Sequence, residues 1–475
     1  MTVEVLGRAA TMSNTWSGQT LPRPHGRLPL LGDIPMSATP RRPVQSITRR
    51  CARLGPIFEI NFLGRRIVMV VGAELNEELS DDSRFGKTLA PAVANLRLFV
   101  KDGLFTAYTD EPAWRLAHDL LRPAFTKAAM ADYHDVMNEV VDELIDTWDR
   151  AHGPVDVSTD LTKTTLETIG RTSFSHTFHS FSSPGQDQFV TSMIAGLTHG
   201  MRRLVFMVMP GGGRLLARKD AQAQEHLNLV YRTIDEIIAA RVAAGDTSGR
   251  DLLGRMLNDA HPVSGDRLDL ENVRYQILTF LVAGHETTSG ALSFAMYYLA
   301  RHPEVLAQAR AEADAVLGGM PDGRPTFEQV PKFRYIRRVI DESLRLWPTA
   351  PGYARAPQET TTIGGRWRMA PEDWALVHLP LLHRDPSVWG PDPERFDPDN
   401  FLPERIRARP AHAYKPFGTG ERACIGRQFA LHEAVLVLAR LLHTFDITPD
   451  PGYTLTVTER LTLMPKGFRL TATRR

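Results

Sequence analysis

The chain has 475 residues, 43% of them hydrophobic, and its 56 basic residues are balanced by 55 acidic ones to a formal net charge of +1. A protein with so little net charge has no field that would gather a nucleic acid or an anionic membrane, so we expect neither as a partner. Two cysteines, Cys51 and Cys424, allow at most one disulfide, whereas secreted frameworks rely on many. We therefore expect a reducing compartment, the cytoplasm.

Residues 1–20 have neither the charged start nor the continuous apolar core of a signal peptide. No apolar run in the chain approaches the roughly 18 residues that a membrane-spanning helix needs. We expect residues 1–20 to be a disordered extension. Residues 21–475 contain no fixed-period repeat, low-complexity block or flexible linker, which predicts a single domain.

Short β-rich runs and long helices are predicted in turn along this domain. Residues 57–62 and 67–71 flank the glycine-containing segment 63–66, which is typical of a hairpin. From about residue 111 to 317, apolar residues recur at three- and four-residue spacing, which predicts amphipathic helices. Further β-rich runs occupy 360–363, 453–457 and 461–464. The predicted fold class is mainly α with small β-sheets.

A predicted core helix, apolar from residue 275 onward, changes character at Ala283-Gly284-His285-Glu286-Thr287-Thr288. Glycine costs about 1 kcal/mol relative to alanine in a helix, and threonine hydroxyls can bond to carbonyl groups four residues earlier. Such a local weakness indicates a functional site, although a packing glycine with satisfied threonines is the plainer alternative. His285 has no second histidine one turn away, so we assign it no metal.

The segment 415–426 is rich in glycine and contains Cys424, and a helical pattern follows it from residue 427 to 444. The helix N-terminus favours a thiolate over a thiol, which makes Cys424 a competent metal ligand. Glycines at 418, 420 and 426 would let the backbone approach a flat cofactor closely. A lone cysteine is otherwise more often a buried structural residue. Here it lies in a ten-residue pattern with five fixed positions: Phe417, Gly420, Arg422, Cys424 and Gly426.

This pattern resembles the haem-binding loop of the cytochrome P450 family, and the 283–288 segment resembles that family's oxygen-binding groove. The resemblance implies a single-domain cytochrome P450 fold and a haem b whose iron is held by Cys424. An axial thiolate favours cleavage of the O–O bond. It also implies that Thr287 hydrogen-bonds the bound oxygen and that Glu286 helps to relay protons. The other implied haem contacts are Phe417, Gly418, Arg422, Gly426, Trp114, His118, Lys87 and Ala283.

Glu342 and Arg345 are one helical turn apart and can form an ion pair. Alone, such a pair usually lies on the surface and contributes little to stability. With the segment that follows, it resembles the Glu-x-x-Arg helix of the family. The family's third partner is an arginine in a Phe-x-Pro-Glu-Arg-Phe segment, and this chain has Asn400 at that position. We expect Asn400 to hydrogen-bond Glu342 or Arg345, so that an amide takes the place of the family's third, cationic partner.

The similarity extends from Leu54 to Phe468 and is closest to the haem domain of the self-sufficient bacterial fatty-acid hydroxylases. Those relatives carry a diflavin reductase on the same chain, whereas this sequence stops at Arg475. We therefore expect electrons from a separate ferredoxin, flavodoxin or diflavin reductase, unless the sequence is part of a longer fusion.

The substrate is expected to be apolar, and its class stays open. Arg65 matches the arginine that meets a fatty-acid carboxylate in those relatives, but the accompanying tyrosine is replaced by Met69. The run 204–209 is apolar and rich in methionine, which adapts to irregular partners. A terpenoid or polyketide-like substrate is thus as credible as a fatty acid. The implied substrate contacts are Phe105, Arg65, Met69, Val93, Leu96, Val100, Ala283 and Ala350.

Three functions remain open at this point. The first is an NAD(P)H-dependent monooxygenase that uses O2. The second is a peroxide-driven peroxygenase of the same fold, although such enzymes tend to replace the acid and the alcohol that are present here as Glu286 and Thr287. The third is a non-enzymatic haem-thiolate sensor, which would need neither a proton relay nor a substrate pocket.

Overall fold

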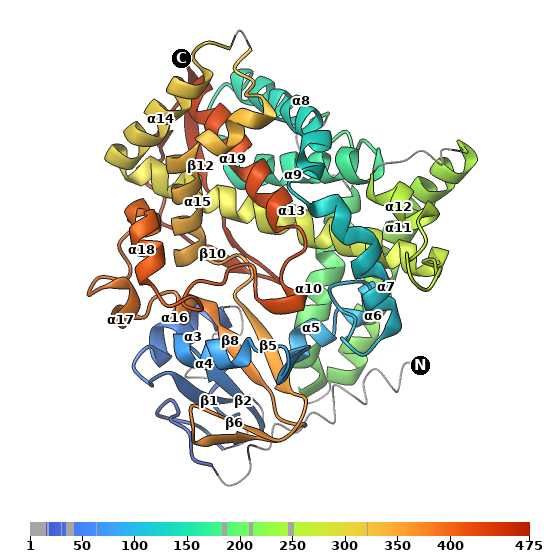
Figure 1. The fold of residues 1–475 in the computed structure, drawn as a ribbon, viewed down its shortest axis with the longest axis vertical. Coiled ribbons are helices and arrows are strands. Elements are labelled where there is room, and N and C mark those ends of the chain that lie inside the picture. Colours follow the sequence, from blue (N-terminus) through green and yellow to red (C-terminus); the bar gives the residue numbers. More distant parts are fainter. Residues whose placement is uncertain are drawn as a thin grey trace.

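The computed structural model describes residues 16, 19–29, 31–34, 42–62, 64–182, 188–208, 212–245, 251–320 and 322–475, without the side chains of 92, 201–208 and 212–215. Helices dominate it (Figure 1). The longer ones are α7 (Pro112–Leu121), α8 (Ala129–Asp149), α9 (Val157–Phe174), α10 (Gln188–Val208), α11 (Gly212–Ala243), α13 (Leu270–Arg301), α14 (Pro303–Leu317), α15 (Arg334–Leu346) and α19 (Arg427–Thr444). Shorter helices are α3 (Pro43–Cys51), α4 (Ala73–Leu79), α5 (Pro91–Ala94), α6 (Arg97–Val100), α12 (Leu252–Asn258), α16 (Leu379–Leu382), α17 (Pro386–Trp389) and α18 (Pro403–Ala408).

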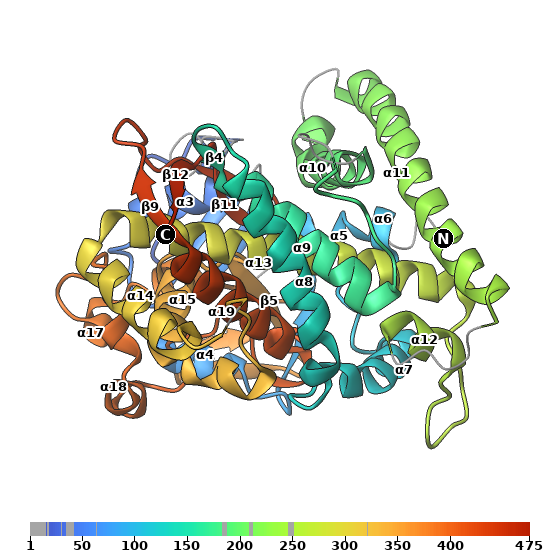
Figure 2. The same ribbon diagram turned by 90° about the horizontal axis from the view of Figure 1, so that it is seen from above.

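Helix α13 crosses the middle of the molecule and contacts α9, α15 and α19 (Figures 1 and 2). It is buried along most of its length, and the Asp269 side chain caps its start by accepting a hydrogen bond from the Asn272 N–H at 2.7 Å. The polar stretch does not break the helix. Thr287 and Thr279 each donate a hydroxyl hydrogen bond of 2.7 Å to the carbonyl four residues earlier, as the sequence predicts.

The strands form four small sheets, and the main one has the order β1-β2-β8-β5-β3. Its strands are β1 (Ile57–Phe62), β2 (Arg65–Val70), β3 (Phe85–Thr88), β5 (Gly352–Pro357) and β8 (Ala375–His378). The predicted hairpin of β1 and β2 is confirmed, with Phe62 opposite Arg65 at the turn. Strand β2 pairs in parallel with β8, so that residues 68–70 lie beside residues 375–377.

The remaining sheets consist of β6 (Thr361–Ile363) with β7 (Trp367–Met369), β10 (Val457–Glu459) with β11 (Leu463–Pro465), and β4 (Val155–Asp156) with β12 (Arg469–Arg474) and β9 (Phe445–Pro449). The tail strands differ from the prediction, because the run 453–457 is extended only from Val457 onward. The predicted class, mainly α with small separate sheets, is confirmed.

The predicted disordered extension contains one residue that is firmly packed. Trp16 is fully buried in the core beneath the main sheet, its backbone N–H donates to Asp373 Oδ1 at 2.8 Å, and its indole N–H donates to the Trp374 carbonyl at 3.3 Å. The expectation of disorder therefore does not hold at Trp16. Residues 1–15, 17 and 18 lie outside the described residues.

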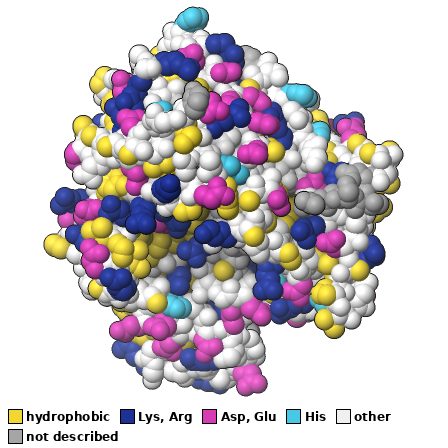
Figure 3. Space-filling model, turned by 45° about the horizontal axis from the view of Figure 1, so that its top comes forward, with side chains coloured by type: hydrophobic (Ala, Val, Ile, Leu, Met, Phe, Trp, Pro, Cys, Tyr) yellow, Lys and Arg dark blue, Asp and Glu magenta, His cyan; other side chains and the backbone are white. Residues whose placement is uncertain are grey.

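Acidic and basic side chains are interspersed over the face drawn in Figure 3, as expected for a chain whose charges nearly cancel. Within the ranges that the structure describes, no helix combines the length and the apolar character needed to cross a membrane.

Candidate active site

The loop before α19 is shaped by glycines in left-handed backbone conformations. Gly418 and Gly420 have φ values of +72° and +67°, which favour glycine. A Cβ on Gly420 would lie only 2.0 Å from Asp82 Oδ2. The same carboxylate accepts the Glu421 N–H at 2.8 Å and pairs with Arg355 at 2.6 Å. Asp82, which the sequence reasoning did not identify, therefore ties the loop to the main sheet.

Cys424 comes two residues before Gly426, which precedes the first residue of α19. Its backbone N–H donates to the Phe417 carbonyl at 2.8 Å, which closes the loop. The residue is accessible to solvent, yet it is so densely surrounded that burial raises the pKa of its thiol, while the Gly426 N–H and Arg427 act in the opposite direction. The sequence predicted that the helix N-terminus would lower the pKa of this thiol. In the structure, burial has the larger effect and raises that pKa. A side chain that is enclosed and still accessible lines a space inside the protein.

Two cations, Lys87 and Arg422, lie together near this loop. Lys87 is partly accessible, but it is enclosed enough that burial, followed by the charge of Arg422, holds its pKa well below the ordinary value. Arg422 donates to the carbonyls of Leu104 and Ala107 at 3.3 and 2.7 Å, and its buried Nη1 has no partner among the residues described. Burial lowers its pKa to about 10. Among the described residues, no carboxylate lies within ion-pair distance of either cation.

Trp114 and His118 lie one turn apart on α7, and Trp114 contacts Arg422. Their rings stack with centroids 5.2 Å apart, and the Arg422 guanidinium lies 4.4 Å from the centre of the Trp114 ring. Trp114 is buried, whereas His118 is partly exposed and contacts Asp119 at 3.1 Å. Trp114 therefore lies beside the Arg422 guanidinium, and His118 stacks on Trp114.

Several contacts join the cysteine loop to α13. The Leu104 N–H donates to Gln276 Oε1 of α13 at 2.9 Å, and Arg422 bonds to the carbonyl of the same Leu104. Phe125 stacks on Phe280 of α13 with centroids 5.4 Å apart, and it lies 4.0 Å from where a Cβ of Gly426 would be. The thiol, the two cations and the middle of α13 thus belong to one region.

The middle of α13 presents an opening in an otherwise buried helix. Ala283 is exposed and Gly284 and Thr287 are partly exposed, although the other residues from 281 to 288 are buried. Ala350, in the loop after α15, is also exposed, and the neighbouring Thr349 lies 3.0 Å from where a Cβ of Gly290 would be. Accessible positions therefore occur both in the middle of α13 and in the loop after α15.

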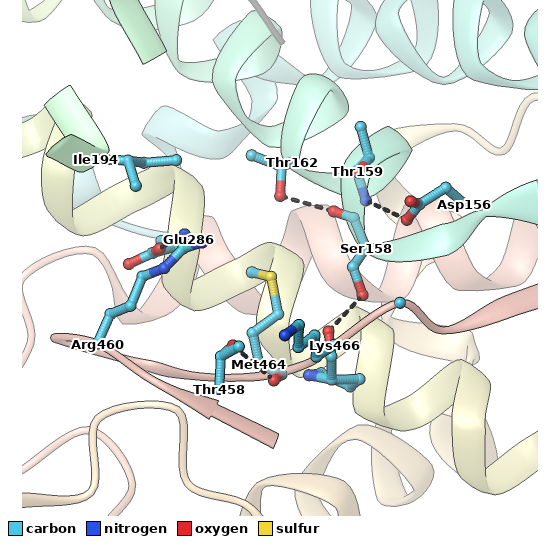
Figure 4. A pocket seen from close by; sticks show the side chains of 12 residues that line it. Asp156, Ser158, Thr159, Thr162, Ile194, Glu286, Thr458, Arg460, Met464 and Lys466 are labelled. Atoms are coloured by element: carbon cyan, nitrogen blue, oxygen red, sulfur yellow. Dashed lines mark hydrogen bonds and ion pairs between the residues drawn. The ribbon is translucent and has the colours of Figure 1, made fainter. Parts of the chain in front are cut away.

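Glu286 has a different environment from the one we expected. Its side chain is buried, with Oε1 3.1 Å from Arg460 Nη1 (Figure 4), and with Oε2 accepting the Thr462 hydroxyl at 2.7 Å. It contacts the C-terminal hairpin rather than Thr287, whose hydroxyl bonds to the Ala283 carbonyl. Arg460 and Thr462 were missed because nothing in the sequence links them to a helix more than 170 residues earlier.

A family model described as cytochrome P450 matches residues 22–472. The chain belongs to the cytochrome P450 family. It is 43% identical over 453 residues to a bifunctional cytochrome P450/NADPH–P450 reductase of Bacillus cereus, and 43% identical over 442 residues to one of Bacillus subtilis. It is 37% identical over 450 residues to a self-sufficient cytochrome P450 monooxygenase of Aspergillus niger. These alignments cover 95%, 93% and 94% of this chain but 42%, 41% and 42% of the relatives, so the chain spans about two fifths of their length.

Members of the cytochrome P450 family hold haem iron through a cysteine thiolate, and the residues of this chain fit that group. The accessible thiol of Cys424 can serve as the metal ligand. Lys87 and Nη1 of Arg422 are donors without an anionic partner in the ranges that the structure describes, and haem carries two carboxylates. The positive charge of the site is thus complementary to the propionates.

The Glu-x-x-Arg pair of the cytochrome P450 family is fully buried here. Arg345 contacts Glu342 through two bonds of 2.7 Å, and it also donates to the carbonyls of His383, Pro393 and Arg395 at 2.7 to 3.0 Å. Asn400 Nδ2 donates to Glu342 Oε1 at 3.2 Å, in agreement with the expected contact. The network therefore connects α15 with the chain that leads toward the cysteine loop.

Arg409 supplies a second cation near this pair. Its guanidinium lies 3.8 Å from the centre of the Trp389 ring, which Arg345 also contacts at 4.8 Å, and it donates to the Asn400 carbonyl. Burial lowers its pKa to about 10, and the charge of Glu342 acts in the opposite direction. Asn400 is neutral where the family's segment has an arginine. Arg409 thus lies where its positive charge can replace the one that is missing at Asn400.

We expect Arg409→Met to lower the free energy of unfolding by about 2 kcal/mol, the size of a desolvated cation–π contact. Denaturant titration of the haem-bound protein would measure this. Arg405→Met is the matched control, because Arg405 is half exposed and its contact with Asp397 is 3.3 Å long, which predicts a loss below about 1 kcal/mol. Equal losses for the two variants would contradict the role of Arg409.

The predicted substrate contacts fall into two groups. Leu96, Val100 and Phe105 pack in or against an apolar cluster that includes α13 residues, and Val93 is partly buried nearby on α5. Met69 is different, because its side chain is 2% exposed and packs in the core between the hairpin, α3 and α16. Met69 therefore lies apart from the apolar cluster around α13, and its contact with substrate stays a prediction. Arg65 is exposed at the hairpin turn, and the side chains of 204–209 lie outside the described residues.

Proposed function

We propose that the protein is a haem-thiolate monooxygenase that inserts one atom of O2 into an apolar substrate. The observation that carries the proposal is the enclosed, accessible thiol of Cys424 near two cations, Lys87 and Arg422, that have no carboxylate partner within the described part of the chain. Haem bound there would supply the activation of O2. The similarity to a Bacillus cytochrome P450/NADPH–P450 reductase and to an Aspergillus self-sufficient cytochrome P450 monooxygenase supports a monooxygenase fed by a reductase.

In this proposal, each residue of the chain has a limited task. Cys424 holds the iron, and Arg422, Lys87, Trp114 and His118 hold the propionate side of the haem. The loop of Phe417, Gly418 and Gly426 leaves room for the macrocycle and surrounds the sulfur. Ala283 would contact the haem and the substrate with a small side chain. Thr287 holds a hydroxyl at that face, and Glu286 exchanges protons with it.

The substrate would bind against the apolar surface formed by Val93, Leu96, Val100, Phe105, Ala283 and Ala350. The apolar cluster around α13 favours a hydrocarbon body, and the exposed Arg65 suits a carboxylate at the entrance. A fatty acid uses both features, whereas a terpenoid or polyketide-like substrate uses only the first. Spin-state shifts of the haem, measured with matched fatty acids and terpenoids, would separate them. An Arg65→Ala variant should weaken the binding of fatty acids and leave the binding of terpenoids unchanged.

We propose that electrons come from NADPH through a reductase, whether it is a separate protein or joined to this chain. Product formation with NADPH and a diflavin reductase, compared with hydrogen peroxide alone, tests this. Product only with NADPH supports the monooxygenase, and product only with peroxide identifies a peroxygenase. A thiolate-type absorption band of the reduced, carbon-monoxide-bound protein without product from any tested substrate would favour a sensor.

We expect Thr287→Ala to retain haem and substrate binding but to lower product formation by about a hundredfold, since a positioned proton-transfer group contributes at least that much. The electrons should appear as hydrogen peroxide, measured against NADPH consumption. Thr279→Ala is the matched control, because Thr279 makes the same backbone hydrogen bond two turns earlier on α13. Unchanged coupling in Thr287→Ala would rule out this role for its hydroxyl.

A further inference from the structure

The loop of residues 101–107 follows α6 and leads toward α7. Its last four carbonyl groups each accept a hydrogen bond from a cationic side chain: Leu104 and Ala107 from Arg422, Phe105 from Lys87, and Thr106 from Arg97. Arg422 and Lys87 belong to the proposed haem site, whereas Arg97 reaches the loop from α6. The backbone that carries Phe105 is thus shared between the two haem cations and a third cation outside that site.

Of these three cations, Arg97 alone has a carboxylate partner among the described residues. Its guanidinium contacts Glu111 through two bonds, Nη1 to Oε2 at 2.9 Å and Nη2 to Oε1 at 2.7 Å, and Nη1 also donates to the Thr106 carbonyl at 2.7 Å. Glu111 Oε2 accepts the Tyr108 N–H at 2.9 Å. A two-bond contact between arginine and carboxylate has a defined geometry, so this pair fixes the end of the loop relative to α6 and to the start of α7.

The loop begins with a backbone conformation that residues other than glycine rarely adopt. Lys101 has a φ of +49° and a ψ of −124°. Such a conformation is strained and persists only where the surrounding contacts enforce it. Here the Lys101 N–H donates to the Arg97 carbonyl at 3.1 Å, and the Lys101 carbonyl accepts the Thr106 hydroxyl at 2.7 Å. Because the Arg97 side chain also holds Thr106, Arg97 contacts the strained loop at both of its ends.

The middle of the loop lies directly against α13. A Cβ on Gly103 would collide with the Thr279 hydroxyl, so that only glycine fits at this position. The next residue, Leu104, donates its N–H to a glutamine side chain of α13 at 2.9 Å. Phe105 follows, is partly exposed and packs against the apolar cluster of the proposed substrate surface. Its backbone is therefore fixed by α13 on one side and by the contact of Arg97 on the other.

We propose that Arg97, held by Glu111, is a positioning residue that keeps this strained loop in place and thereby fixes where Phe105 meets the substrate. Lys87 adds a contact from the haem side, because its Nζ lies 4.8 Å from the centre of the Phe105 ring. When the contact of Arg97 is lost, the backbone at Lys101 relaxes and Phe105 moves, so that the substrate presents a different carbon for oxidation. The inference rests on the proposed function for its substrate, whereas the position of the loop can be measured without turnover.

Arg97→Met removes the charge and keeps much of the side-chain length. In the haem-bound protein, we expect amide hydrogen exchange in residues 101–108 to rise at least about tenfold, because hydrogen bonds to a charged group are lost. With hexadecanoic acid or a terpenoid of similar size as the probe, the ratio of products hydroxylated at neighbouring carbons should change about tenfold, since a displacement of about 1 Å can alter a rate by about a hundredfold. Arg97→Lys keeps the charge and should recover part of both effects. If Arg97→Met is recovered unfolded, Glu111→Gln should show the same changes at smaller size.

Arg241→Met is the matched control. Arg241 and Arg97 are both 8% exposed, and Arg241 also combines a two-bond contact, here with Asp251 at 2.6 and 2.9 Å, with a hydrogen bond to a backbone carbonyl, that of Phe174 at 3.3 Å. Its pair joins α11 to the start of α12 instead. Arg241→Met should therefore lower stability as Arg97→Met does, but leave the exchange of residues 101–108 and the product ratio unchanged.

Lys101→Gly tests the strain, because glycine adopts the left-handed conformation without penalty. Alone it should keep the wild-type product ratio, and the double variant Arg97→Met/Lys101→Gly should regain most of it. The inference is overturned if Arg97→Met has wild-type exchange or a wild-type product ratio, if Arg241→Met changes both equally, or if the double variant behaves like Arg97→Met. If the wild-type protein forms no product from either probe, the proposed function and the role of Phe105 fail together. Raised exchange in Arg97→Met and not in Arg241→Met would still support the hold of Arg97 on the loop.

Discussion

Replacing Cys424 by serine is expected to abolish the thiolate-type absorption band of the reduced, carbon-monoxide-bound protein and to reduce monooxygenase activity to background. A serine hydroxyl stays protonated near neutral pH and is a poor ligand for haem iron, whereas a cysteine becomes a thiolate when metal binds. The glycine loop and the cations would remain, so some haem could still bind through its propionates. Haem content and the position of the band should therefore be measured together.

The chain contains its own control for this experiment. Cys51 is the only other cysteine, and it is buried in the core formed by the hairpin, α3 and α16, where burial raises the pKa of its thiol to about 12. Cys51→Ser should leave the band in place and lower only stability. A thiolate-type band that survives in Cys424→Ser would contradict the assignment of Cys424 as the iron ligand.

Replacing Arg345 by methionine should lower the free energy of unfolding by about 3–5 kcal/mol, the usual cost of removing one partner of a buried ion pair. Glu342 would be left buried without its cation, and the carbonyls of His383, Pro393 and Arg395 would lose a donor. Because single domains are stable by only about 5–15 kcal/mol, much of the protein could be recovered unfolded.

Denaturant titration of the haem-bound protein, with Arg474→Met as the control, measures this loss. Arg474 contacts Asp149 at 3.2 Å, and both side chains are at least 40% exposed, so that substitution should cost less than about 1 kcal/mol. Similar midpoints for the two variants would show that the buried network does not carry the stability inferred for it.

The parts of this protein that could be predicted from sequence are those encoded locally. The ten-residue pattern around Cys424 and the polar stretch of α13 are contiguous, and helical periodicity correctly gave α19 its bounds, 427 to 444. The contact between Glu342 and Asn400 was expected because a family pattern joined two segments, and the structure contains it.

The features that could not be predicted depend on packing between distant segments. The direction of the Glu286 side chain is set by Arg460 and Thr462, and periodicity does not tell which hairpin lies against a helix. Arg409 lies near Glu342 because the end of α18 packs against Trp389 of α17, and the sequence does not predict this packing. Met69 occupies a strand position like that of an entrance residue, but α3 and α16 cover it. Trp16 lies in a segment whose composition indicated disorder.

The parallel pairing of β2 with β8 has a consequence for how the chain folds during synthesis. The hairpin of β1 and β2 can form early, but the inner edge of β2 lacks its partner until residues 375–377 have left the ribosome. The helices from α7 to α15 are made from mostly local contacts in the meantime, whereas closing so long a loop is slow. The β2 edge therefore stays unpaired during much of synthesis, and truncations before residue 375 should leave it open to aggregation.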